Sequence, residues 1–127
     1  MRLLEVHLES ADLDRSISFY ATLFPKARIS KWDDRSAVAF VFDSGTTLGI
    51  WKTGKVGLHG SRAGQHVHYA VQIELDELEI FRQRLLKLGC EVVEHNWQTP
   101  HKSLYFFDPD GHQGELMTVD WHGLLEE

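Results

Sequence analysis

The sequence has 127 residues, 43% hydrophobic and 25% charged, as expected for one ordinary globular domain. A formal net charge of −6 without a dense lysine and arginine cluster argues against nucleic-acid binding, and the single cysteine, Cys90, excludes an internal disulfide. No apolar run approaches the roughly 18 residues of a membrane span, and Glu5 and Glu9 stand where a signal peptide needs apolar residues, so we expect a cytoplasmic protein without membrane partners.

The first half of the chain predicts a strand, a helix and three further strands. Residues 3–9 alternate between apolar and polar side chains, which indicates a strand with one buried face. Asp12 is a candidate N-cap of a helix whose apolar residues recur at helical spacing up to Phe24, and Pro25 ends it. Three β-type runs follow, over residues 27–32, 37–43 and 46–51. A glycine-rich segment then indicates a connecting loop.

The same order starts again in the second half. Residues 66–74 predict a strand, Asp76 is a candidate N-cap, and Gly89 ends the following helix as its left-handed C′ residue. Three β-type runs follow, over residues 91–95, 103–107 and 113–119, the last two joined by the turn Asp108-Pro109-Asp110-Gly111.

We therefore predict an α+β fold of two βαβββ modules in a single domain over residues 1–127. The predicted parts are a first repeat over 1–52, a loop over 53–65, a second repeat over 66–119 and a tail over 120–127. Each half-sheet is too small to bury a core alone, so we expect one curved mixed sheet around a central cleft. Aligning the repeats places Glu5 over His68. The side chains expected to face the cleft come from the first and last strands of each repeat: Glu5, His7, Gly49, Trp51, His66, His68, Glu115 and Met117.

Three motifs carry a resemblance to a known family: DLDRSISFY at 12–20, VHYAV at 67–71 and FDPDGHQGEL at 107–116. On these motifs the sequence resembles the vicinal oxygen chelate superfamily, which includes glyoxalase I, extradiol dioxygenases, fosfomycin-modifying thiol transferases and bleomycin-binding proteins. The resemblance spans nearly the whole chain. It implies the glyoxalase/bleomycin resistance/dioxygenase fold, a small-molecule substrate or ligand, and a homodimer.

The resemblance implies metal ligands at His68 and Glu115, which match the family pattern. The first-strand position, a histidine in the family, is Glu5, and the extra glutamate of glyoxalase I falls near Gly49, which has no side chain to offer. We predict a divalent ion (Mn, Fe, Ni or Zn) held by Glu5, His68 and Glu115, with His7 as a fourth ligand or as a partner of a ligand. One imidazole with two carboxylates favours manganese, iron or magnesium over zinc. Because some family members bind no metal, a metal-free site is the alternative.

The first functional hypothesis is a metal-dependent enzyme, a lyase or a dioxygenase. The ion would bind two neighbouring substrate oxygens, and Glu115 or Glu5 would act as the catalytic base. Substrate-binding side chains are predicted at His7, Trp51, Ser103 and Tyr105. Glyoxalase I itself is disfavoured by its altered ligand positions, and a fosfomycin thiol transferase by the few basic residues available for a phosphonate. The second hypothesis is a non-catalytic protein of the bleomycin-resistance type that sequesters a cationic or aromatic compound, which suits the acidic charge balance.

Overall fold

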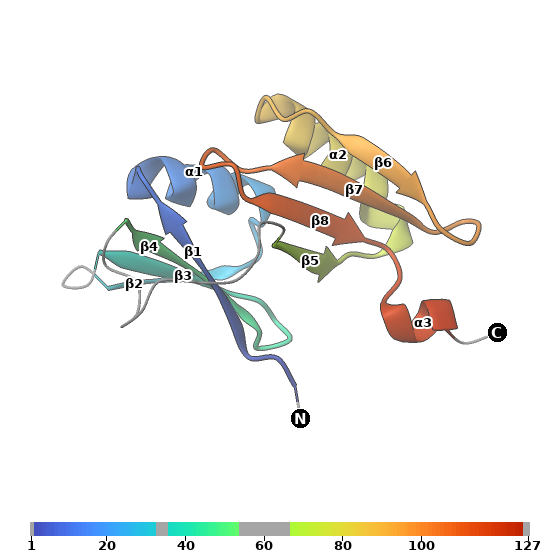
Figure 1. The fold of residues 1–127 in the computed structure, drawn as a ribbon, viewed down its shortest axis with the longest axis horizontal. Helices are drawn as coiled ribbons and strands as arrows, with labels where there is room; N and C mark the ends of the chain where they lie inside the picture. Colours follow the sequence, from blue (N-terminus) through green and yellow to red (C-terminus); the bar gives the residue numbers. More distant parts are fainter. Residues whose placement is uncertain (1, 33–35, 54–66, 126–127) are drawn as a thin grey trace. The chain divides into compact units, whose positions relative to one another are not determined.

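The chain forms two compact units, Met1–Gln65 and His66–Glu127, each with one four-stranded sheet. The structure is a computed structural model and describes residues 2–32, 36–53 and 67–125 (Figure 1). The order β-α-β-β-β occurs in each unit, so the predicted α+β fold of two modules is confirmed. Apart from Thr53, the predicted loop lies outside the described residues, and so does His66.

The first unit is built from a parallel strand pair and an antiparallel meander. Its elements are β1 (Glu5–Ser10), α1 (Leu13–Leu23), β2 (Arg28–Trp32), β3 (Ala37–Val41) and β4 (Thr47–Lys52). The sheet order is β1-β4-β3-β2, with β1 parallel to β4. Asp12 is the N-cap of α1, as predicted, because its carboxylate accepts the Arg15 N–H. Apolar side chains of α1 and of the sheet form the buried core of this unit: Tyr20, Leu23, Val38, Phe40 and Ile50.

The second unit repeats this plan. Its elements are β5 (His68–Gln72), the 3₁₀ turn η2 (Leu75–Glu77), α2 (Leu78–Lys87), β6 (Val93–Asn96), β7 (Lys102–Phe107), β8 (Gln113–Met117) and α3 (Trp121–Leu125). The sheet order is β5-β8-β7-β6, with β5 parallel to β8 (Figure 1). Its buried core includes Phe81, Leu85, Leu104, Phe106 and Leu116. No helix in the described ranges has the length and apolar character needed to cross a membrane.

Two predicted details of the second unit differ from the structure. Asp76 is not the N-cap, because it lies inside the 3₁₀ turn, and the capping box is formed by Glu74 and Glu77 instead. The Glu77 carboxylate accepts the Glu74 N–H at 3.0 Å, so the turn begins before the predicted cap. The predicted tail also contains the short helix α3. Gly89 ends α2 at φ +83°, as predicted.

The strand registers give the two units equivalent faces. β1 begins at Glu5 and β5 begins at His68, so the predicted alignment of these residues agrees with the strands. In the first unit His7 lies opposite Gly49 on β4. In the second unit the equivalent pair is Ala70 and Glu115 on β8. Because side chains alternate along a strand, His7 and Gly49 project from the same face of their sheet as Glu5. In the same way, Ala70 and Glu115 project from the same face as His68.

Candidate functional site

The second unit holds a buried carboxylate, Glu115, at the centre of β8. Glu115 is 4% exposed. Its Oε2 accepts a hydrogen bond from Ser103 Oγ at 2.5 Å, and its Oε1 lies 3.2 Å from His68 Nε2. The neighbour on β5 is Ala70, whose small side chain leaves room beside the carboxylate. A buried carboxylate is tolerated only with such partners, so the local sequence is built around this group.

A chain of hydrogen bonds fixes the orientation of Glu115. Trp97 Nε1 donates to Ser103 Oγ at 2.8 Å, and Ser103 lies on β7 opposite Met117. An indole N–H can only donate, so the Ser103 hydroxyl accepts from Trp97 and uses its own hydrogen for Glu115. Trp97 in turn contacts Trp121 of α3 in an edge-to-face arrangement at 5.6 Å. Trp97 therefore supports the site through Ser103.

Tyr105 borders the same carboxylate. Its ring lies 6.2 Å from the His68 ring, nearly perpendicular to it, and it projects from β7 opposite Glu115. Burial raises the pKa of the Tyr105 hydroxyl, and the charge of Glu115 and a hydrogen bond to it raise that pKa further. Tyr105 is thus held in its protonated form, as a hydrogen-bond donor.

The first unit holds a second carboxylate, Glu5, with a different environment. Its Oε1 lies 3.1 Å from His7 Nε2, and the Glu5 side chain is 59% exposed. Trp51 Nε1 donates to His7 Nδ1 at 2.7 Å. The His7 ring lies directly over Gly49, since a Cβ built on this glycine would fall well inside van der Waals distance of Nδ1. From the sequence, Gly49 is only the position at which the glutamate ligand of glyoxalase I is absent, and no pattern predicts this packing against His7.

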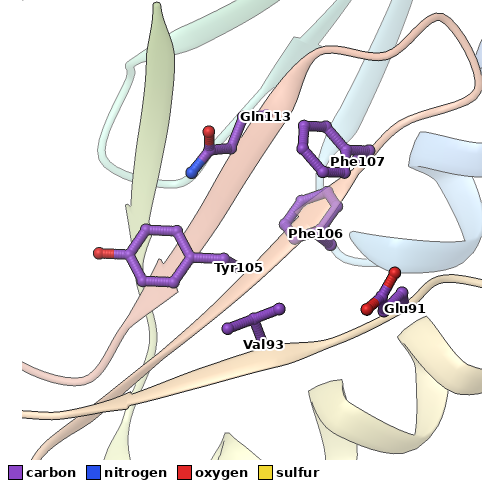
Figure 2. Close-up of a pocket in the computed structure, with 6 residues that line it drawn as sticks. All are labelled: Glu91, Val93, Tyr105, Phe106, Phe107 and Gln113. Atoms are coloured by element: carbon purple, nitrogen blue, oxygen red, sulfur yellow. The ribbon is translucent and has the colours of Figure 1, made fainter. Parts of the chain in front are cut away.

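Each unit has a hollow on its sheet. The hollow in the first unit measures about 490 Å³ and combines Glu5 and Arg28 with small side chains such as Ser30 and Ala39. The hollow in the second unit measures about 260 Å³ and is mainly apolar and aromatic. Its lining residues are Glu91, Val93, Tyr105, Phe106, Phe107 and Gln113. Figure 2 shows Tyr105 and Glu91 on opposite sides of it, with Val93 between them.

A third group, which sequence reasoning did not single out as a metal site, lies in the β7–β8 turn. Among the described residues, Asp108, Asp110 and His112 form the one cluster of three potential metal ligands within 4.8 Å of one another. Asp108 Oδ1 accepts the backbone N–H groups of Asp110 and His112, and its Oδ2 pairs with His112 Nδ1 at 2.7 Å. These bonds close the predicted turn, so the cluster has a structural explanation.

The predicted site residues thus gather into two groups, one in each unit. In the second unit the contacts join His68, Ser103, Tyr105 and Glu115. In the first unit they join Glu5, His7 and Trp51.

Comparison with protein families gives a match over most of the chain. The sequence profile described as Glyoxalase/Bleomycin resistance protein/Dioxygenase superfamily matches residues 2–116. A metallothiol transferase FosB from Shouchella clausii is 30% identical over 111 residues, which is 85% of this chain and 73% of that protein. A metallothiol transferase FosB from Bacillus licheniformis is 32% identical over 113 residues, covering 85% and 69%.

Solved structures share the fold. A fosfomycin resistance protein FosX from Listeria monocytogenes, determined with Mn(II) and 1S,2S-dihydroxypropylphosphonic acid, superposes with a TM-score of 0.77. It is 24% identical, and the match covers 98% of this chain and 95% of that chain. Lactoylglutathione lyase from Agrobacterium tumefaciens gives a TM-score of 0.73 at 20% identity, covering 91% and 92%.

Proposed function

The chain belongs to the glyoxalase/bleomycin resistance protein/dioxygenase superfamily, and from this premise we propose that it is a metal-dependent enzyme acting on a small molecule with two neighbouring oxygens. The observation that carries the proposal is the convergence of His68 Nε2 and Glu115 Oε1 at 3.2 Å, with the other oxygen of Glu115 held by Ser103. The relatives named metallothiol transferases support it.

The donor atoms of the second unit fit a divalent ion. Ligand bonds of about 2.1 Å at octahedral to tetrahedral angles separate neighbouring donor atoms by about 3.0–3.4 Å. The separation of 3.2 Å between His68 Nε2 and Glu115 Oε1 lies in this range. Ser103 supplies the outer hydrogen bond that orients ligating carboxylates. Glu5, predicted from the sequence as the third ligand, belongs to the other unit and stays a prediction.

The side chains around the proposed ion have separate tasks. When bound, the ion would polarise the substrate oxygens and stabilise negative charge that develops on them. Glu115, buried and hydrogen-bonded at Oε2, is suited to remain a ligand. The catalytic base that takes a substrate proton stays predicted at Glu115 or Glu5, of which Glu5 has the more exposed side chain. The protonated Tyr105 hydroxyl donates to Glu115, so it helps to hold that carboxylate in place beside the substrate.

Two reaction classes are compatible with the proposed site. Thiol transfer is suggested by the names of the relatives, and a lyase reaction by the glyoxalase branch of the family. The few basic residues count against an anionic substrate in the second unit, because Lys102 Nζ is already paired with Glu94 Oε2 at 3.2 Å. Arg28, in the hollow of the first unit, is a basic group that borders Glu5. We also propose a homodimer, as the resemblance implies, and a single-domain cytoplasmic protein, as the composition and pattern of the sequence predict.

Metal content and thermal melts test the proposal. Protein purified without chelator is assayed for metal, stripped, and melted with Mn²⁺, Fe²⁺, Ni²⁺ or Zn²⁺. An ion at 100 times its Kd stabilises the native state by about 2.7 kcal/mol. We expect Glu115→Gln and His68→Ala to abolish the shift, Glu5→Gln to weaken it, and Glu79→Gln, a surface control, to leave it intact. A protein that contains no metal and shifts with no ion would overturn the proposal.

A second candidate function follows from the hollow of the second unit. Its aromatic and apolar lining, with Glu91 as the charged residue, suits a cationic aromatic compound. This supports the bleomycin-resistance alternative. Calorimetric titration of metal-free protein with a bleomycin-like cation should then give submicromolar binding that Glu91→Gln weakens. Absence of binding across a cationic panel would refute this candidate.

A further inference from the structure

Both nitrogens of the His7 imidazole are assigned a role by their neighbours in the first unit. Trp51 Nε1 lies 2.7 Å from His7 Nδ1, and an indole N–H can only donate, so Nδ1 must accept. The other nitrogen, Nε2, lies 3.1 Å from Glu5 Oε1. A neutral imidazole whose Nδ1 accepts carries its proton on Nε2, so this proton lies on the side of Glu5. His7 is therefore the neutral Nε2–H tautomer, and its one free electron pair in the ring plane is used by Trp51.

The position of the ring depends on β4 as well. His7 lies opposite Gly49, and Trp51 lies two residues further along the same strand and on the same face. A Cβ at position 49 would overlap Nδ1 and Cε1 of the imidazole. Gly49 thus provides the space and Trp51 the donor, so that β4 fixes both the place and the tautomer of His7.

The second unit shows the reverse arrangement at the equivalent pair. There the small residue, Ala70, is on the first strand of the unit, and the large polar residue, Glu115, is on the last. The pair in the first unit has the large residue, His7, on the first strand and glycine on the last. The imidazole therefore fills the space that a side chain on β4 would otherwise take.

We propose that His7 is a positioning residue for Glu5 and does not itself ligate a metal ion, because the lone pair of Nδ1 accepts from Trp51 and Nε2 carries the proton. The first unit then offers a carboxylate oxygen and no imidazole nitrogen. This consequence rests on the proposed metal site. A unit that offers carboxylate oxygen without imidazole nitrogen favours Mn²⁺ over Zn²⁺ more strongly than a unit that offers both.

The tautomer is tested in metal-free protein by long-range ¹H–¹⁵N NMR of the imidazoles. We expect His7 to give the Nε2–H pattern in the native protein. Trp51→Phe keeps an aromatic ring but removes the donor, so His7 should then populate both tautomers. Trp121→Phe, which alters an exposed indole of the second unit, is the matched control and should leave the His7 pattern unchanged. An Nδ1–H pattern in the native protein, or no change in Trp51→Phe, would overturn the inference.

Metal affinity separates a positioning role from ligation. His7→Gln retains an N–H donor for Glu5, whereas His7→Ala removes it. We expect His7→Ala to weaken Mn²⁺ binding about tenfold, the effect of losing an outer hydrogen-bond partner, and His7→Gln to recover most of this loss. Trp51→Phe should raise Zn²⁺ affinity relative to Mn²⁺. Equal losses in the Gln and Ala variants would identify His7 as a ligand and overturn the inference. If the native protein binds no ion, the proposed metal site is refuted and the NMR result alone decides the role of His7.

Discussion

The two units share one strand order and one pairing scheme, but they place their large polar side chains on different strands. In the first unit His7 stands on the first strand and glycine occupies the paired position on the last. In the second unit Ala70 stands on the first strand and Glu115 on the last. At this pair of positions, one strand carries a large polar side chain and its partner a small residue. The comparison shows that either strand can carry the large one.

In both units one intermediate side chain contacts an indole N–H on one side and a carboxylate on the other. Trp51 reaches Glu5 through His7 in the first unit. Trp97 reaches Glu115 through Ser103 in the second. The carboxylates differ in exposure, because the Glu5 side chain is 59% exposed and that of Glu115 is 5% exposed. The buried carboxylate is therefore the more rigidly held of the two, and substitutions around it should cost more.

The largest effect is expected at a glycine of the second unit. A Cβ on Gly114 would overlap the far end of the Phe106 ring, and Phe106 is 1% exposed. Overpacking a filled core costs about 1–3 kcal/mol, and we expect Gly114→Ala to reach the upper end of that range in urea unfolding. A loss smaller than that of Gly49→Ala would contradict the ranking of the two units.

Removing the hydroxyl of Ser103 should have the next largest effect. Ser103→Ala takes one partner from the buried Glu115 and one from Trp97. Leaving a buried polar group without its hydrogen bond costs about 1–3 kcal/mol. Denaturant unfolding measures the stability loss, and a matched change at an exposed serine of the first unit, Ser30→Ala, should cost much less. Equal losses would show that Glu115 does not depend on Ser103.

A smaller loss of stability is expected for a substitution of Gly49 in the first unit. Gly49→Ala forces the His7 ring aside, and because that ring is partly exposed we expect a loss of about 1 kcal/mol. His7→Ala should remove the overlap, so that the double variant is more stable than the sum of the single changes predicts. Strict additivity in this double-mutant cycle would contradict the packing of His7 over Gly49.

The smallest expected effect concerns the titration of Tyr105. Its raised pKa means that the folded protein keeps the phenolic proton to higher pH than the unfolded chain does. Below the unfolded pKa of about 10, Tyr105 is protonated in both states and its titration does not change the free energy of unfolding. As the pH rises from there through the folded pKa, only the unfolded chain loses the proton readily, so the free energy of unfolding falls. Ultraviolet titration of Glu115→Gln should give a lower Tyr105 pKa than the native protein, still above the ordinary value because burial remains. An unchanged titration would show that Glu115 does not influence Tyr105.

Local signals in the sequence were sufficient for most of the fold. Asp12 and Gly89 mark helix ends through backbone chemistry that depends on a few neighbouring residues, and both predictions are confirmed. The cap predicted at Asp76 is wrong because the acidic residues on either side of it, Glu74 and Glu77, form the capping box with each other's backbone. The repeat was visible because each module repeats the same order of alternating and helical periodicity.

The candidate site was only partly visible in the sequence. The contact of His68 with Glu115 follows from the family motifs, and Ser103 and Tyr105 lie beside that carboxylate. The packing of His7 over Gly49 could not be predicted. It depends on the parallel register of β1 and β4, which are separated along the chain by a helix and two strands, and no local pattern encodes that register.

The central claim is that Glu115 and His68 hold a divalent ion, and electron paramagnetic resonance of added Mn²⁺ tests it most directly. Binding removes the sharp signal of free Mn²⁺, so the number of sites and the affinity are read from one titration. We predict one site per chain, lost in Glu115→Gln and in His68→Ala and retained in Asp110→Asn, which alters the cluster of the β7–β8 turn. Mn²⁺ binding that survives Glu115→Gln, or that disappears in Asp110→Asn, would contradict the account.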